Sequence, residues 1–82
     1  MKKNRRHYSA FLKVITSIRL SKKISQKQLA EKLGVNQSFV SKFESGERRL
    51  DLLELRQICS ALDVLLVDFV KELEKEIERQ QP

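Results

Sequence analysis

The sequence is poor in the residues that build cross-links, metal sites and tight turns. Its 82 residues include one cysteine, one histidine, one proline, two glycines and no tryptophan. A single cysteine excludes a disulfide framework within the chain, and no metal-ligand spacing is present, so neither a metal nor a cofactor is expected. So few glycines and prolines leave almost no turn chemistry for β-hairpins. We therefore expect an all-α chain of one small domain.

Long apolar runs and catalytic constellations are missing as well. No stretch approaches the roughly 18 apolar residues that cross a bilayer. Lys13 and Arg19 interrupt the apolar N-terminal segment, which also lacks a small-residue cleavage site. One histidine, one cysteine and no glycine-rich loop cannot supply a nucleophile, a base and an oxyanion site. We expect a cytoplasmic protein that is not an enzyme and has no membrane contact or apparent small-molecule effector.

Acidic residues are scarce in the first part of the chain. Residues 1–49 hold thirteen Lys and Arg against three Glu, whereas residues 50–82 hold four against eight acids. This asymmetry favours a polyanion as the partner of the basic part, although a merely solvated surface has the same composition. The basic tail at residues 1–8 is either an arm for DNA phosphates or a solubilising leader.

What the sequence does contain is apolar residues at helical spacing. One helix is expected from a Ser9 N-cap to residues 21–23, another from a capping box at Asp51 and Glu54, and a last one over residues 65–79. The inward positions of these three helices are Phe11, Leu12, Ile15, Ile18 and Leu20, then Leu52, Leu55, Ile58, Cys59 and Leu62, then Leu65, Leu66, Phe69, Val70, Leu73 and Ile77.

The middle of the chain carries the clearest local signals. Ser25 and Gln28 have the spacing of a reciprocal capping box, which opens a helix. Gly34 is expected to end that helix in the left-handed conformation, and Gly46 to end the next one, for which Asn36 is the expected N-cap. Two helices of about eight or nine residues joined by a short turn have the dimensions of a helix-turn-helix motif.

The stretch SQKQLAEKLGVNQSFVSKFESGERRLDLLEL resembles the phage-repressor and Cro-like (XRE-type) helix-turn-helix family. The resemblance covers about residues 9–69, and its ordered set of dipeptides is far more specific than any one of them. It implies a compact five-helix, lambda-repressor-like domain over residues 9–70, with the motif at about 25–46. Residues 71–82 would then extend the last helix.

The resemblance also implies a function. A protein of this family is expected to be a transcriptional regulator, repressor-like and associated with the nucleoid. Its recognition helix, at about residues 37–45, reads double-stranded DNA in the major groove. Amide and lysine side chains can pair with base edges, while helix N-termini and arginines suit phosphates.

Particular side chains follow from that assignment. The expected base contacts are Gln37, Ser38, Phe39, Ser41 and Lys42, and the expected phosphate contacts are Gln26, Lys27, Arg48 and Arg49. In an unrelated small domain, Gln26 and Gln37 would be plain solvated helix residues. Glu44 matches a family glutamate that pairs with an arginine of the first helix, here Arg19, in a structural ion pair.

The last helix is longer than a small core requires. Leu73 and Ile77 are therefore expected to form the interface of a homodimer, which would place two recognition helices about 34 Å apart on a palindromic operator. The alternative is a protein-interaction module, such as an antitoxin or an accessory subunit, with the last helix as its working part. Activators, repressors, antitoxins and restriction–modification controllers share this module, so the sequence leaves its cellular role open.

Overall fold

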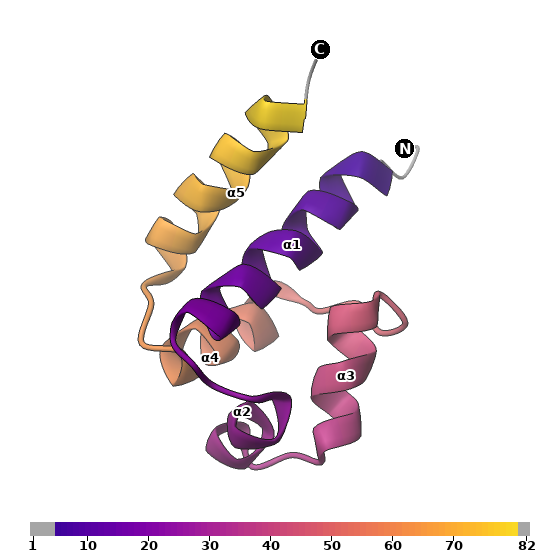
Figure 1. Cartoon of the computed structure of the whole chain (residues 1–82), viewed down its shortest axis with the longest axis vertical. Helices are drawn as coiled ribbons and strands as arrows, with labels where there is room; N and C mark the ends of the chain where they lie inside the picture. Colours follow the sequence, from indigo (N-terminus) through magenta and orange to yellow (C-terminus); the bar gives the residue numbers. More distant parts are fainter. Residues whose placement is uncertain (1–4, 81–82) are drawn as a thin grey trace.

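The computed structural model describes residues 5–80, and within them it contains helices and no strand. The helices are α1 (Arg5–Ser21), α2 (Gln26–Leu33), α3 (Gln37–Ser45), α4 (Leu52–Ala61) and α5 (Leu66–Gln80). The two long helices, α1 and α5, lie side by side and antiparallel, and the three short ones gather at one end of that pair (Figure 1). The expected all-α class and five-helix arrangement are confirmed.

The core lies where the long pair meets the three short helices. Each helix contributes at least one large side chain that is fully buried: Ile15, Leu29, Val40, Phe43, Ile58 and Phe69. Helices of eight to ten residues are marginal on their own. Because burying one such side chain contributes about 1.5–3 kcal/mol, tertiary packing is what holds the short helices in place.

The predicted capping boxes of α2 and α4 are confirmed. The Ser25 hydroxyl accepts a hydrogen bond from the Gln28 amide at 3.0 Å, and the Gln28 side chain accepts one from the Ser25 amide at 2.8 Å. Asp51 and Glu54 exchange the same pair of bonds at 2.7 and 2.9 Å. These bonds fix where α2 and α4 begin.

The glycines end α2 and α3 as expected, but the expected cap of α3 is wrong in part. Gly34 and Gly46 have φ of 71° and 87°, in the left-handed region. Asn36 occupies the N-cap position of α3, yet its side chain makes no capping hydrogen bond. Its backbone carbonyl accepts from the Phe39 amide at 3.0 Å, so the backbone alone closes the first turn of α3.

The start of α1 also differs from the expectation. Ser9 is not an N-cap, because α1 already begins at Arg5. Residues 5–8 of the expected basic tail therefore form the first turn of this helix, and residues 1–4 of that tail lie outside the described residues. Ala10 and Val14, which the apolar pattern did not single out, are buried on the inner side of α1.

Several positions expected inside are on the surface. Leu20, Leu52 and Val70 are exposed, and Leu65 precedes α5 and is exposed too. Two successive spacings of three residues turn the helix by about 120° relative to its starting direction. Leu52 therefore points well away from the direction in which Ile58 is buried. Residues three apart lie on the same face of a helix, but residues six apart do not.

Candidate nucleic-acid interface

The motif at the centre of the chain is built from α2 and α3, which pack against each other. The inner side of α3 is fixed by Val40 and Phe43, both completely buried. Its outer side carries Gln37, Ser38 and Lys42, all exposed, and Ser41, which is half-buried. These four expected base-contacting residues therefore lie at least partly open to solvent on a rigidly anchored helix.

Phe39, the fifth of them, lies differently. Its ring is half-buried and meets Phe43 edge-on, with 5.6 Å between ring centroids. The guanidinium of Arg48 lies 4.5 Å from the centroid of the Phe39 ring. One face of the ring is thus covered by a cation, so Phe39 supports Arg48 as well as bordering the surface.

Arg48 is held from a second side by α4. Its guanidinium donates to the Glu54 carboxylate at 2.8 Å. This hydrogen bond raises the pKa of Arg48 and is the main cause that lowers the pKa of Glu54 below its ordinary range. Ser38, Phe39, Lys42 and Arg48 line one side of an open hollow of about 610 Å³ next to the turn of the motif. Arg48 therefore stands at the edge of the same surface as α3.

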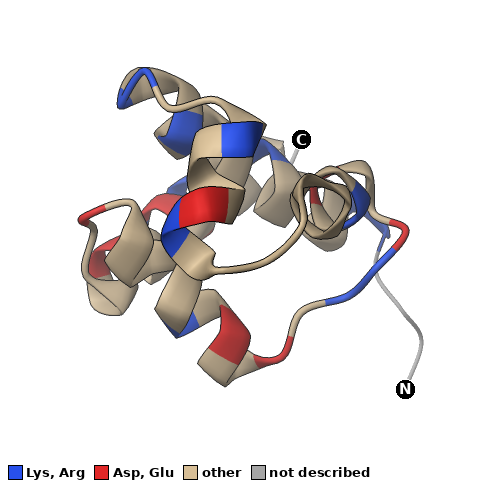
Figure 2. Cartoon of the chain, turned by 90° about the horizontal axis from the view of Figure 1, so that it is seen from below, with Lys and Arg blue, Asp and Glu red and all other residues tan. Residues whose placement is uncertain are grey.

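Arg49 is fixed by α1. Its guanidinium lies 4.1 Å from the centroid of the Tyr8 ring, while its side chain remains exposed. The loop between α3 and α4, which contains Arg48 and Arg49, has a blue basic stretch in Figure 2. The sequence pattern places both arginines in this loop but gives no sign of the two aromatic rings that orient them.

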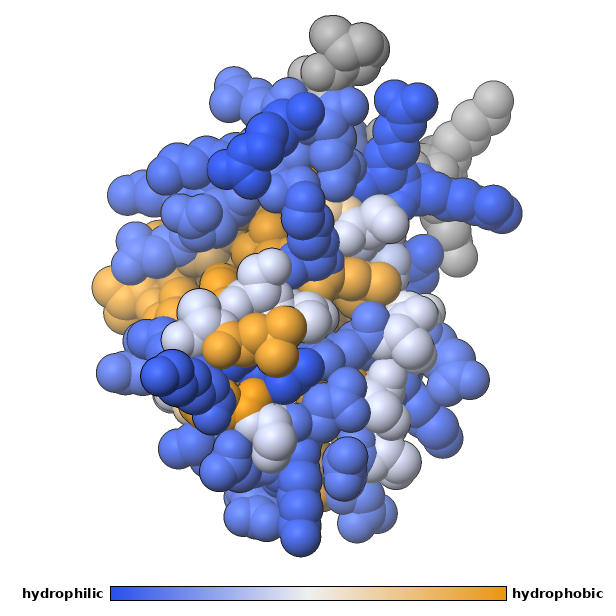
Figure 3. All heavy atoms as spheres, in the orientation of Figure 1, coloured by the Kyte–Doolittle hydropathy of each residue, from blue (hydrophilic) through white to orange (hydrophobic). Residues whose placement is uncertain are grey.

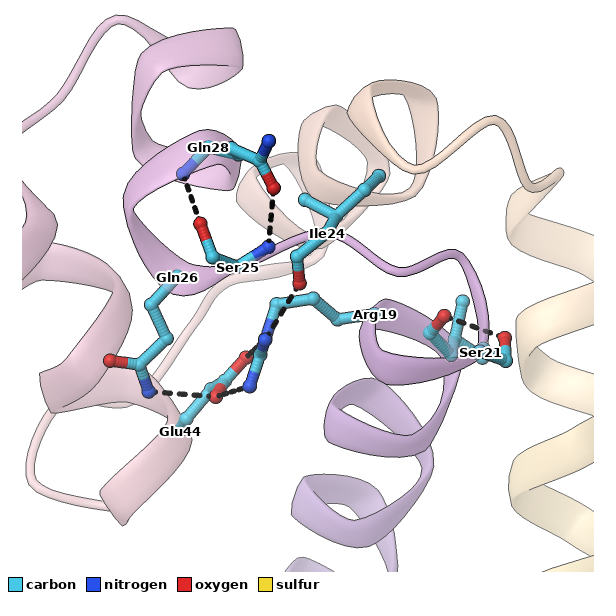
Figure 4. A network of polar contacts seen from close by, with 8 residues as sticks. Arg19, Ser21, Ile24, Ser25, Gln26, Gln28 and Glu44 are labelled. Carbon is cyan, nitrogen blue, oxygen red and sulfur yellow. Dashed lines mark hydrogen bonds and ion pairs between the residues drawn. The ribbon is translucent and has the colours of Figure 1, made fainter.

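A buried network joins the ends of α1 and α3 to the start of α2 (Figure 4). Arg19 donates to both carboxylate oxygens of Glu44, at 2.7 and 3.0 Å, and both side chains are less than a tenth exposed. Arg19 also donates to the backbone carbonyl of Ile24 at 2.8 Å. The charge of each partner is therefore compensated inside the protein, as a buried ion pair requires.

Gln26 belongs to this network. Its side-chain amide donates to Glu44 at 3.0 Å and is half-buried. A primary amide has two N–H donors, so one remains for a partner outside the protein. Lys27, the next residue along α2, is exposed. The amide of Gln26, which is expected to contact a phosphate, is therefore oriented by Glu44.

The far part of α5 is tied to α1 by a buried carboxylate that the sequence analysis missed. Glu76 is only 5% exposed and accepts from Lys13 of α1 at 3.0 Å. Arg79 and Gln80 also donate to it, at 2.7 and 3.3 Å. The Lys13 hydrogen bond is the main cause that lowers the pKa of Glu76.

The expected dimer residues are partly used within the chain. Leu73 is half-buried and packs against the core, and Ile77 is half-buried. More open apolar side chains lie at Leu52, Leu53, Leu65, Val67 and Val70, which are 64%, 73%, 67%, 62% and 42% exposed. Figure 3 shows apolar surface at mid-height on the side where α5 begins, between hydrophilic regions.

Two negative findings limit the chemistry within residues 5–80. No cluster of three or more His, Cys, Asp and Glu side chains in this range could hold a metal ion. None of the helices described there combines the length and apolarity needed to span a bilayer. The one thiol, Cys59, is buried, and burial raises its pKa, which disfavours the reactive thiolate.

Two short helices packed against each other, with the outer side of the second left polar and arginines beside it, define a helix-turn-helix protein. The helix-turn-helix family model matches residues 15–69, and the chain belongs to this family, in its XRE-type branch. The assignment made from the sequence is confirmed. Members of the family are DNA-binding transcriptional regulators, not enzymes.

Solved structures agree with this membership. The restriction–modification controller protein C.Esp1396I is 32% identical, with a TM-score of 0.86 over 95% of this chain and 100% of that one. An XRE-family like protein from Pseudomonas syringae pv. tomato str. DC3000 is 39% identical, with a TM-score of 0.79 over 84% of each chain. The clp gene regulator ClgR from Corynebacterium glutamicum, at 24% identity, shares the fold with a TM-score of 0.80 over 90% of this chain and 79% of that one. No curated protein sequence matches significantly.

Proposed function

We propose that this chain is a sequence-specific, repressor-like regulator that reads double-stranded DNA with α3 in the major groove. The observation that carries the proposal is the two-sided construction of α3. Val40 and Phe43 anchor its inner side, while Gln37, Ser38 and Lys42 stand free on the outer side. An amide can pair bidentately with adenine and a lysine can donate to guanine, so this face has the chemistry for reading base edges. With DNA as its partner, the protein is expected in the cytoplasm, on the nucleoid.

Phosphate contacts at both ends of the motif would set its register on the duplex. Gln26 and Lys27 lie at the start of α2, where the helix N-terminus attracts an anion. Arg48 and Arg49 lie beyond the end of α3 and are held by Phe39 and Tyr8. Contacts of this kind carry no sequence information but supply affinity that falls steeply with salt.

A homodimer would give the module its specificity for a palindrome. Val67, Val70 and Ile77 lie along one side of α5, next to the side that packs into the core. With the uncovered part of Leu73, they form an apolar strip that a second copy of α5 can cover. In a twofold dimer, the same strip of both copies meets itself.

The test is selection of DNA from a random pool, followed by footprinting and substitution. Replacing Gln37 and Lys42 by Ala should abolish the preference for the selected sequence, while circular dichroism stays unchanged. Replacing Lys71 and Lys75, two exposed lysines of α5, is the matched control and should leave the preference intact. If the Gln37→Ala, Lys42→Ala variant keeps the wild-type preference, α3 is not the reading helix.

A further inference from the structure

The first turn of α1 lies against the loop between α3 and α4. Two separate observations bring them together. Arg49 of the loop lies over the ring of Tyr8 at 4.1 Å. At the other end of the loop, a Cβ on Gly46 would lie 3.3 Å from Cδ1 of Leu12. Tyr8 and Leu12 are four residues apart, so one side of α1 runs along this loop.

That side of α1 is anchored to the core. The ring of Tyr8 lies 5.4 Å from the ring of Phe11, and Phe11 meets the fully buried Phe69 edge-on at 5.7 Å. The Tyr8 hydroxyl is buried and has no hydrogen-bond partner within residues 5–80. The ring of Tyr8 therefore holds Arg49 by its face, and its hydroxyl takes no part.

Arg5 is on the same side of the helix as Tyr8 and Leu12. It precedes Tyr8 by three residues and Leu12 by seven, and residues at these spacings project from the same side of an α-helix. Arg6 precedes Lys13 by seven residues and so shares the side that faces Glu76 of α5. Both arginines are exposed, neither has an ion-pair partner among the described residues, and the turn contains no acid.

We propose that Arg5 contacts the DNA backbone beside the phosphate contact of Arg49. The surface that meets DNA then extends beyond the helix-turn-helix motif onto the first turn of α1. Tyr8 acts as the positioning residue that joins the two cations into one rigid basic edge. DNA is the occupant because this edge continues the Arg48–Arg49 loop, so the inference rests on the proposed function.

The experiment compares two neighbouring arginines that differ only in the side of α1 they occupy. Affinity for a mixed-sequence duplex of about three helical turns is measured over a range of salt concentrations. Removing one side chain that binds a phosphate should reduce the slope of log affinity against log salt by about 0.9. Arg5→Ala should lower the slope by about that amount, and Arg6→Ala should keep nearly the wild-type slope.

Each outcome decides a different claim. If Arg5→Ala and Arg6→Ala lower the slope equally, the effect comes from net charge alone and the contact is overturned. The contact is also overturned if neither variant lowers the slope. If the wild-type chain shows no salt-dependent binding, the proposed function fails, and this contact fails with it. Binding with the wild-type slope in every variant overturns the contact alone.

The positioning role of Tyr8 has its own measurement. Tyr8→Phe keeps the ring and should keep the wild-type slope. Tyr8→Ala, with its fold checked by circular dichroism, should reduce the slope as Arg49→Ala does, and combining the two should add little. A folded Tyr8→Ala variant with the wild-type slope would contradict this role. Should Tyr8→Ala fail to fold, additive reductions for Tyr8→Leu and Arg49→Ala would contradict it equally.

Discussion

Glu44 illustrates how one side chain can serve both the fold and the surface. Its carboxylate compensates the buried charge of Arg19 and also orients the amide of Gln26, which is expected to meet a phosphate. In the proposed complex, Glu44 therefore orients a DNA-facing amide in addition to its structural role in the ion pair. A change at this position should alter stability first and the geometry of the DNA-facing amide second.

Glu44→Ala should cost about 3–5 kcal/mol in the free energy of unfolding, because it leaves the buried Arg19 without a partner of opposite charge. Gln26→Ala removes only one hydrogen bond and should cost about 0.5–1.5 kcal/mol. Urea denaturation of both variants measures the difference. Equal destabilisation by the two variants would mean that the ion pair with Arg19 contributes no more to stability than the hydrogen bond from Gln26.

At the scale of whole helices, local chemistry explains which features the sequence predicts. The capping boxes at Ser25 and Asp51 and the left-handed glycine at position 34 need only neighbouring residues, and all were predicted. The side-chain cap expected at Asn36 is absent because the amide of Phe39, three residues later, donates to the backbone carbonyl of Asn36 instead of its side chain.

The Arg19–Glu44 pair, which joins α1 to α3, was expected only from the family resemblance. Other features that depend on how helices meet could not be predicted from the sequence. Arg48 over Phe39, Arg49 over Tyr8 and the amide of Gln26 on Glu44 all join residues from different elements. In the sequence, Glu76 looks like one more acid of a charged helix end. It is buried because Lys13 of α1 lies opposite it.

Glu76 should make the docking of α5 on α1 sensitive to acid. Because its pKa in the folded protein is lowered, the carboxylate contributes stability that is fully present above the ordinary glutamate pKa of about 4.3. That stability is lost as the pH falls through the lowered folded pKa. The melting temperature of the wild type should therefore fall with acid more than that of Glu76→Gln does.

Glu74→Gln, at an exposed position two residues away, is the matched control for this measurement. It should leave the acid dependence of the melting temperature close to that of the wild type. If Glu76→Gln and Glu74→Gln show the same profile, the contact between Lys13 and Glu76 does not stabilise the helix pair.

At the scale of the whole molecule, the apolar surfaces and the charge lie in different places. The basic loop and the first turn of α1 form one edge, whereas most of the exposed large apolar side chains lie at the starts of α4 and α5. A partner protein can therefore cover apolar surface without covering the residues expected to meet DNA. Two sites compete for that role, the strip on α5 and the start of α4.

Serine substitutions on the two sites decide between them. Val70→Ser with Ile77→Ser removes apolar area from the α5 strip without touching the fully buried core, so it should weaken the dimer in sedimentation equilibrium. Leu53→Ser, which lies in the first turn of α4 and is 73% exposed, should leave the dimer intact. The reverse result would move the interface to α4, and a wild type that stays monomeric would remove the dimer altogether. On DNA, the weakened variant should still protect a single half-site, because every proposed base and phosphate contact lies within one subunit, while losing cooperative protection of two half-sites one helical turn apart.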